Sequence, residues 1–90
     1  MTAERISRIR AALEQNLAPL ELHIKDDSAR HAGHAGAREG GHFQVRVVSD
    51  AFRGKNAIQR HRLVFAAVDS LMGSDIHALN IDARTPEEVS

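Results

Sequence analysis

Apolar residues recur every three or four positions along the first part of the chain, which is the period of one helix face. The residues that carry this pattern are Ile6, Ile9, Leu13 and Leu17. Thr2 offers an N-cap and Glu4 lies in the first turn, whereas Pro19 cannot continue a helix. The pattern therefore predicts an amphipathic helix that begins near Thr2 and ends before Pro19.

Two later stretches alternate apolar and polar residues, which is typical of strands with one buried face. In the first stretch the apolar positions are Leu20, Leu22 and Ile24, and in the second they are Phe43, Val45 and Val47. We expect these strands to pair antiparallel, with the apolar residues on one face of the sheet. His23 and His42 fall on the polar face and are expected to be surface residues.

The second half of the chain predicts a helix and a third strand. Asn56 can cap a helix over about residues 57–72, with Gln59 as its capping-box partner and Gly73 at its end. We expect the buried stripe of this helix to contain Ile58, Val64, Phe65, Val68, Leu71 and Met72. The third strand begins at Ile76, and the strand–helix–strand connection predicts that it runs parallel to the second strand.

Together these elements predict an α+β fold in a single small domain over residues 1–90. Its core is a three-stranded mixed sheet with the helices on one face. Residues 49–55 form a turn that can hold one short helical turn, so the order is α-β-β-α-α-β. Residues 84–88 look like the capped start of a further helix.

The composition excludes several classes of function. The formal net charge is zero, so no overall attraction favours nucleic acid or membrane. The absence of cysteine excludes disulfides, thiol catalysis and an iron–sulfur cluster held by this chain alone. No apolar run approaches the roughly 18 residues of a membrane helix, and no secretory segment is recognised, which predicts a cytoplasmic protein. Six histidines are the chief remaining candidates for function.

Three of these histidines could share a metal. Residues 28–41 are rich in glycine and contain His31 and His34, and His77 lies at the start of the third strand. A loop of this length in a compact domain tends to be functional or disordered. Neutral imidazole is a good ligand for iron, zinc and copper. The alternative is that the loop histidines are solvated and that His77 is a partly buried residue at a strand end.

The densest basic group surrounds the start of the second helix and contains Arg53, Lys55, Arg60 and Arg62. Phosphate contact is the functional interpretation, and a solvated helix face is the alternative. Nucleic-acid-binding KH domains place a paired-glycine loop before their helix to clamp phosphates, whereas this chain has Gly54 alone. That difference weakens the case for binding single strands.

Several segments resemble the BolA family over nearly the whole chain. They are Phe43-Gln44-Val45-Arg46-Val47-Val48-Ser49, Phe52-Arg53-Gly54-Lys55, Arg60-His61-Arg62-Leu63-Val64, Ile76-His77-Ala78-Leu79 and Thr85-Pro86. The resemblance implies a type II KH-like fold. It also implies roles in bacterial transcriptional regulation and in iron–sulfur trafficking with monothiol glutaredoxins.

The family resemblance also implies a ligand set. In family complexes a [2Fe-2S] cluster is held by a glutaredoxin cysteine, a glutathione thiol and the BolA-like protein. The histidine of the Ile-His-Ala-Leu segment, here His77, is one ligand. The loop between the first two strands supplies the other, for which His31 is the first choice and His34 the second.

The sequence thus leads to one hypothesis and one rival. The hypothesis is a non-enzymatic adaptor that binds a monothiol glutaredoxin and co-ligates the cluster, with no cofactor on the isolated chain. The rival is a transcriptional regulator that binds duplex DNA through the basic turn and helix. A serine hydrolase is not predicted, because no nucleophile elbow or oxyanion loop accompanies the serines.

Overall fold

The computed structural model describes residues 2–27 and 41–89. In chain order its elements are α1 (Thr2–Leu17), β1 (Glu21–Asp26), β2 (Gly41–Val48), η3 (Asp50–Phe52), α2 (Ala57–Ala67), η4 (Asp69–Leu71), β3 (Ile76–Arg84) and α3 (Pro86–Val89). This order confirms the α+β prediction, including the short helical turn before α2. Within the described ranges, no helix combines the length and the apolar character that spanning a lipid bilayer requires.

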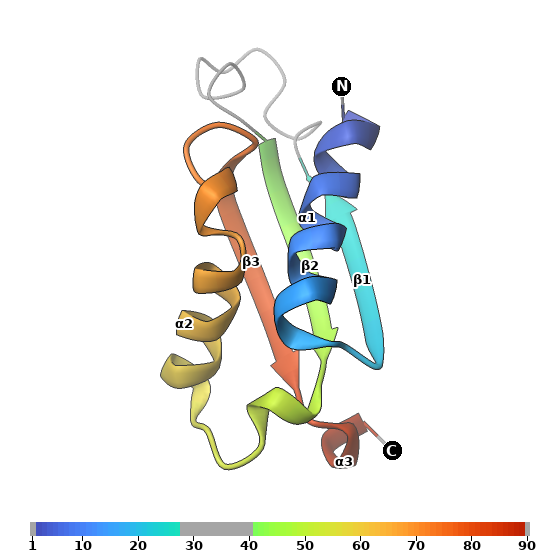
Figure 1. Ribbon diagram of the computed structural model, residues 1–90, viewed down its shortest axis with the longest axis vertical. Coiled ribbons are helices and arrows are strands. Elements are labelled where there is room, and N and C mark those ends of the chain that lie inside the picture. Colours follow the sequence, from blue (N-terminus) through green and yellow to red (C-terminus); the bar gives the residue numbers. More distant parts are fainter. Residues whose placement is uncertain (1, 28–40, 90) are drawn as a thin grey trace.

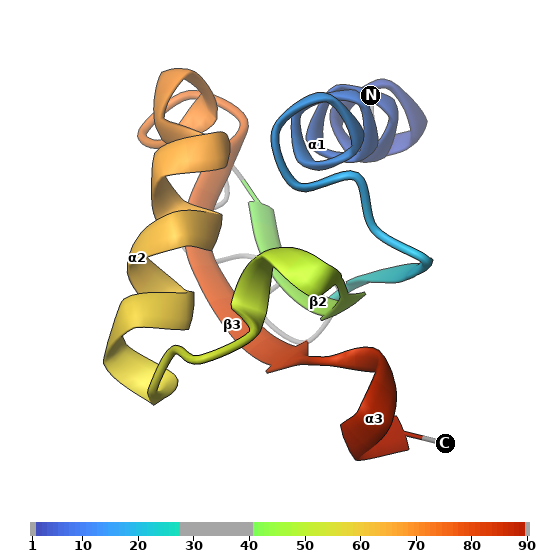
Figure 2. The ribbon, with the colours of Figure 1, turned by 60° about the horizontal axis from the view of Figure 1, so that its bottom comes forward.

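The three strands form one mixed sheet in the order β1-β2-β3 (Figure 1). β1 pairs antiparallel with β2, and β2 pairs parallel with β3, as the alternation and the crossover predicted. Figure 2 shows that α1 and α2 lie on the same side of the sheet. The opposite face of the sheet therefore carries the polar residues of the strands.

One hydrophobic core fills the space between the helices and the sheet. Its buried members are Ile9, Leu13, Leu17, Phe43, Val45, Val47, Phe52, Val64, Val68 and Ile76. Every apolar residue named for the second strand and three of the four named for the first helix are in this set. The spacing of the apolar residues predicted their burial because side chains return to the same face about every 3.6 residues in a helix and every second residue in a strand.

The predicted stripe of α2 was partly wrong. Ile58 and Phe65 remain 64% and 38% exposed, and the buried contacts of α2 come instead from Val64, with Val68 at the helix end. Ile58 and Phe65 are seven residues apart and so share the outward side of the helix. The α-helix also ends at Ala67, and a separate turn, η4, follows before Met72.

Leu20 was also wrongly assigned to the core. It is 69% exposed, although Leu22 and Ile24 of the same strand pack against the core. β1 begins only at Glu21 and α1 ends at Leu17, so Leu20 lies in the connection between helix and strand rather than under the helix.

Ser49 joins three parts of the fold. Its side chain is 1% exposed, and its Oγ donates to the carbonyl of Leu17 at 2.5 Å and accepts from the amide of Ala51 at 3.0 Å. The first bond satisfies a carbonyl at the end of α1 that has no partner within the helix, and the second caps η3. This hydroxyl therefore has a structural role.

The capping prediction is confirmed at the start of α2. The Asn56 side chain accepts from the Gln59 amide at 2.9 Å, and the Gln59 side chain accepts from the Asn56 amide at 2.9 Å. The predicted helix end at Gly73 was wrong, because the C-cap of α2 is Val68; Gly73 lies in the turn after η4, with φ of 85°, a left-handed conformation that suits glycine. At the chain's other predicted cap, the Thr85 amide donates to Glu88 Oε1 at 2.8 Å.

Candidate functional site

His77 lies at an irregularity in the sheet. Gly41 pairs with Ile76, but His42 pairs with Ala78, so His77 is an additional residue at the start of β3. Such a bulge redirects a side chain relative to regular alternation, and bulges occur often at functional sites. The Ile76 side chain before it is fully buried, whereas the His77 side chain is exposed.

The structure places His42 beside His77. Their ring centroids are 5.2 Å apart and the rings are inclined by 42°. Each is the second residue of its strand, and the two strands are parallel neighbours, so the pairing brings both rings to the same end of the sheet. The sequence interpretation treated His42 only as a surface residue and missed this contact. The available signal was the repeated placement of a histidine one residue after a strand start.

Backbone bonds fix this end of the sheet. The Gly41 amide donates to the Asp75 carbonyl at 3.0 Å, and the Asp27 amide donates to the His42 carbonyl at 2.7 Å. His31 and His34 lie outside the described residues. The described residues on either side of them, Asp27 and Gly41, are bonded to His42 and to Asp75, the residue before β3.

An ion pair connects α1 to Asp75, the residue before β3. Arg8 Nε donates to Asp75 Oδ2 at 2.8 Å and Nη2 donates to Oδ1 at 2.6 Å, with Arg5 Nε 3.7 Å from the same carboxylate. Hydrogen bonding from Arg8 lowers the pKa of Asp75, and the same bond raises the pKa of Arg8. The helix therefore anchors the backbone from which His77 projects.

The donor set suits a metal that has further ligands elsewhere. Two imidazoles are suitable ligands for iron, zinc or copper. Among the described residues, no group of three or more histidine, cysteine or carboxylate side chains could hold a metal ion. The chain also lacks thiolates, which iron–sulfur clusters require. The pair thus fits a cluster only if a partner supplies the thiolates.

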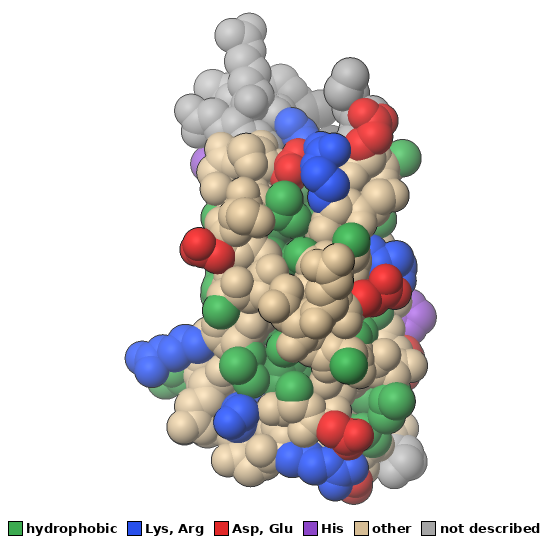
Figure 3. All heavy atoms as spheres, in the orientation of Figure 1, with side chains coloured by type: hydrophobic (Ala, Val, Ile, Leu, Met, Phe, Trp, Pro, Cys, Tyr) green, Lys and Arg blue, Asp and Glu red, His purple; other side chains and the backbone are tan. Residues whose placement is uncertain are grey.

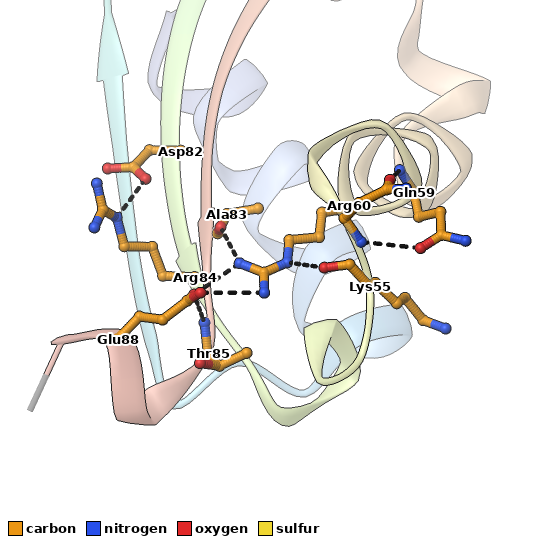
Figure 4. Close-up of polar contacts among 9 residues, drawn as sticks. Lys55, Gln59, Arg60, Asp82, Ala83, Arg84, Thr85 and Glu88 are labelled. Atoms are coloured by element: carbon orange, nitrogen blue, oxygen red, sulfur yellow. Dashed lines mark hydrogen bonds and ion pairs between the residues drawn. The ribbon is translucent and has the colours of Figure 1, made fainter.

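Two of the four predicted phosphate-binding residues already have internal partners. Arg60 donates to Glu88 through Nη1 at 2.7 Å and Nη2 at 3.2 Å, and to the carbonyls of Lys55 and Ala83 (Figure 4). Its side chain is only 16% exposed. Arg60 lowers the pKa of Glu88 from 4.5 to about 2. Arg60 therefore holds α3 against the start of α2.

Arg53 is held in the same way. Its guanidinium pairs with Asp50 at 2.7 Å and with Glu87 of α3, and hydrogen bonding to Asp50 raises its pKa. Lys55 and Arg62 are exposed, and no ion pair is formed by either one within the described part of the chain. On the helix-bearing face, acidic and basic side chains are interspersed rather than gathered by sign (Figure 3). Of the four basic residues, only Lys55 and Arg62 therefore remain available to contact phosphate without breaking an ion pair within the described residues.

A shallow groove of about 400 Å³ lies on the polar face of the sheet, away from both sites. Its lining mixes His23, Lys25 and Arg46 with Asp82 and amide side chains. His23 Nε2 lies 2.9 Å from Glu21 Oε1, which accepts when that nitrogen carries the proton, and Arg84 Nε donates to Asp82 at 2.8 Å. The mixture of signs favours no particular ligand.

Comparisons with known proteins identify the family. The family profile of BolA, described as BolA-like protein, matches residues 13–88. The chain is 47% identical over 91% of its length to SufE-like protein 1, chloroplastic/mitochondrial, from Arabidopsis thaliana, and covers 24% of that protein. It is 35% identical over 98% of its length to the DNA-binding transcriptional regulator BolA of Escherichia coli strain K12, and covers 79% of it.

Solved structures show the same fold. The BolA domain of SufE1 from Arabidopsis thaliana superposes with a TM-score of 0.80 at 49% identity, covering 91% of this chain and 92% of that one. The chain spans a quarter of the first relative's length and somewhat over half of that of several others. Profile, sequence and fold agree over most of its length, and the chain therefore belongs to the BolA family.

Proposed function

We propose that this protein is a BolA-like adaptor that binds a monothiol glutaredoxin and co-ligates a [2Fe-2S] cluster shared with glutathione. It has no turnover of its own. The observation that carries the proposal is the exposed imidazole of His77, placed at a sheet irregularity beside a second imidazole, in a chain without cysteine. An exposed ligand on a rigid strand is accessible to a partner that brings the thiolates.

The division of ligands follows from their chemistry. A [2Fe-2S] cluster with two cysteines on one iron and two histidines on the other is a known ligand combination, and its histidines raise the reduction potential. This chain would supply nitrogen ligands, and a glutaredoxin and glutathione would supply sulfur. The Arg8–Asp75 ion pair and the Gly41–Asp75 backbone bond would hold the His77 backbone in place during cluster transfer.

Co-purification with a monothiol glutaredoxin tests the proposal. The complex, reconstituted with glutathione, iron and sulfide, should show the visible absorption and circular dichroism of a histidine-ligated cluster. His77→Ala should abolish or strongly change that spectrum. His23→Ala is the matched control, because His23 is 67% exposed on β1 and pairs in the sheet with Arg46 rather than with His42. An identical spectrum in His77→Ala and in the parent complex would rule out ligation by His77.

The loop ligand is tested in the same complex. We expect His31→Ala to change the spectrum more than His34→Ala does, because His31 matches the family ligand position better. If a variant that lacks His31, His34 and His77 together keeps the parent spectrum, the ligation proposal is wrong. The isolated chain should be colourless after purification, since two nitrogen ligands without thiolates do not retain a cluster.

A second candidate function is duplex DNA binding, and the E. coli relative named as a DNA-binding transcriptional regulator favours it. Exposed Lys55 and Arg62 are the residues best able to reach phosphates, because Arg53 and Arg60 carry internal ion pairs. Binding should weaken as salt rises. Removing either phosphate contact should lower the salt slope by about 1.

The DNA experiment compares Lys55→Ala and Arg62→Ala with Arg10→Ala, a change on α1 away from the basic group. The first two should weaken binding to all sequences about equally, since phosphate contacts carry no sequence information. Fluorescence anisotropy with a labelled duplex at low and near-physiological salt measures this. If the protein does not bind duplex DNA even at low salt, this second function is wrong. If it binds but neither substitution weakens binding, the DNA interface does not include Lys55 and Arg62.

A further inference from the structure

The rings of His42 and His77 lie at the separation expected of two imidazoles that share one ion. Two imidazoles bound to one tetrahedral ion, with metal–nitrogen distances of about 2.0–2.1 Å, have ring centroids about 5 Å apart. The observed separation is 5.2 Å. One ion could therefore bind both rings with side-chain rotation and no movement of the strands.

The backbone that carries the pair is already fixed from several directions. The Gly41 amide bonds to Asp75, the His42 carbonyl accepts from Asp27, and the Gly73 amide donates to the Ile76 carbonyl at 2.8 Å. The Asp75 carboxylate is in turn held by Arg8. Because these bonds hold the backbone of both residues, binding would order little more than the two side chains.

We propose that His42 and His77 together chelate one borderline divalent cation, such as Zn²⁺, in the isolated protein. The pair fills two coordination positions, and the remaining positions stay open to water or to a partner's ligands. Cation binding by the isolated chain does not depend on the proposed function above, in which His77 and a loop histidine are the cluster ligands.

The site is distinct from the loop ligands that the sequence suggested. His42 lies on β2, the central strand, and not in the 28–40 segment that carries His31 and His34. A variant without the two loop histidines separates the alternatives. If the loop supplies the essential ligand, that variant should lose the cation; if the sheet pair suffices, it should retain it.

Zinc titration of the full-length His31→Ala/His34→Ala variant by isothermal calorimetry is the test. We expect binding of one Zn²⁺ per chain. Adding His42→Ala or His77→Ala should weaken it on the order of tenfold or more, as expected when a ligand is lost. His61→Ala, an exposed histidine on α2, is the control and should leave the affinity unchanged.

Imidazole ¹⁵N chemical shifts provide a second measurement that a loss of folding could not imitate. Zinc should shift a ring nitrogen of both His42 and His77, and far-UV circular dichroism should confirm that each variant is folded. His42→Asn serves if His42→Ala is unstable. Absence of zinc binding in the loop variant, or affinity unaffected by His42→Ala, would overturn the proposal. A colourless glutaredoxin complex together with intact zinc binding would instead refute only the proposed function.

Discussion

Replacing Ser49 by alanine should measure how strongly one buried hydroxyl holds the ends of α1, β2 and η3 together. The substitution removes the donor to the Leu17 carbonyl and the acceptor for the Ala51 amide. Leaving one buried polar group without a partner costs about 1–3 kcal/mol. Loss of the cap on η3 adds a smaller amount, because only one short turn depends on it. We expect the free energy of unfolding to fall by about 2–3 kcal/mol.

Ser74→Ala is a matched control. Ser74 Oγ also donates to a helical carbonyl, that of Leu71 at 3.2 Å, but this bond is exposed and water can replace it. Its loss should change stability by about 0.5 kcal/mol or less. The two variants remove the same chemical group and differ mainly in burial.

Chemical and thermal denaturation followed by circular dichroism are the suitable assays, since the chain contains neither tryptophan nor tyrosine. For a domain of this size each kcal/mol shifts Tm by about 4–8 °C, so Ser49→Ala should lower Tm on the order of 10–20 °C. The urea m-value should stay unchanged, because the exposed area on unfolding is the same. Equal losses in Ser49→Ala and Ser74→Ala would refute the argument from burial.

Three further outcomes follow from the ion pairs. Arg60 lowers the pKa of Glu88 to about 2, so this pair stabilises the fold above pH 4.5 and loses its effect as pH falls toward 2; Glu88→Gln should flatten the acid side of a stability–pH curve, and an unchanged curve would contradict this. Arg8 likewise lowers the pKa of Asp75, so Asp75→Asn should reduce the free energy of unfolding at neutral pH. Urea titrations should show the difference in this free energy between variant and parent shrinking as pH falls below 3.8. Replacing both Glu87 and Glu88 by glutamine should raise duplex DNA affinity at low salt by releasing Arg53 and Arg60, and unchanged anisotropy titrations would show that these arginines do not reach phosphate.

Local patterns were sufficient for most of the fold. The alternation of Phe43, Val45 and Val47 and the capping pair at Asn56 are properties of neighbouring residues, and both were confirmed. Ile58 and Phe65 were misassigned because both faces of α2 contain apolar residues, and only the position of the sheet decides which face is buried. Propensity and period cannot supply that information.

The candidate site was less predictable, because it too depends on how distant parts of the chain are placed relative to one another. That His77 is an additional residue in the β2–β3 ladder, and that His42 lies beside it, depends on strand register, which a single sequence does not fix. The internal partners of Arg60 depend on where α3 returns to the domain. The prediction for His31 and His34 concerns residues outside those described and stays a prediction.

The parallel pairing of β2 with β3 has a consequence for how the chain folds. Gly41 pairs with Ile76 and Val48 with Arg84, so the partner strand arrives only after the whole of α2 has been placed. Non-local pairings of this kind form slowly. Until they form, one edge of the apolar β2 strand is open to the same strand of another molecule. Refolding yield should therefore fall as protein concentration rises, even though the native domain covers that edge.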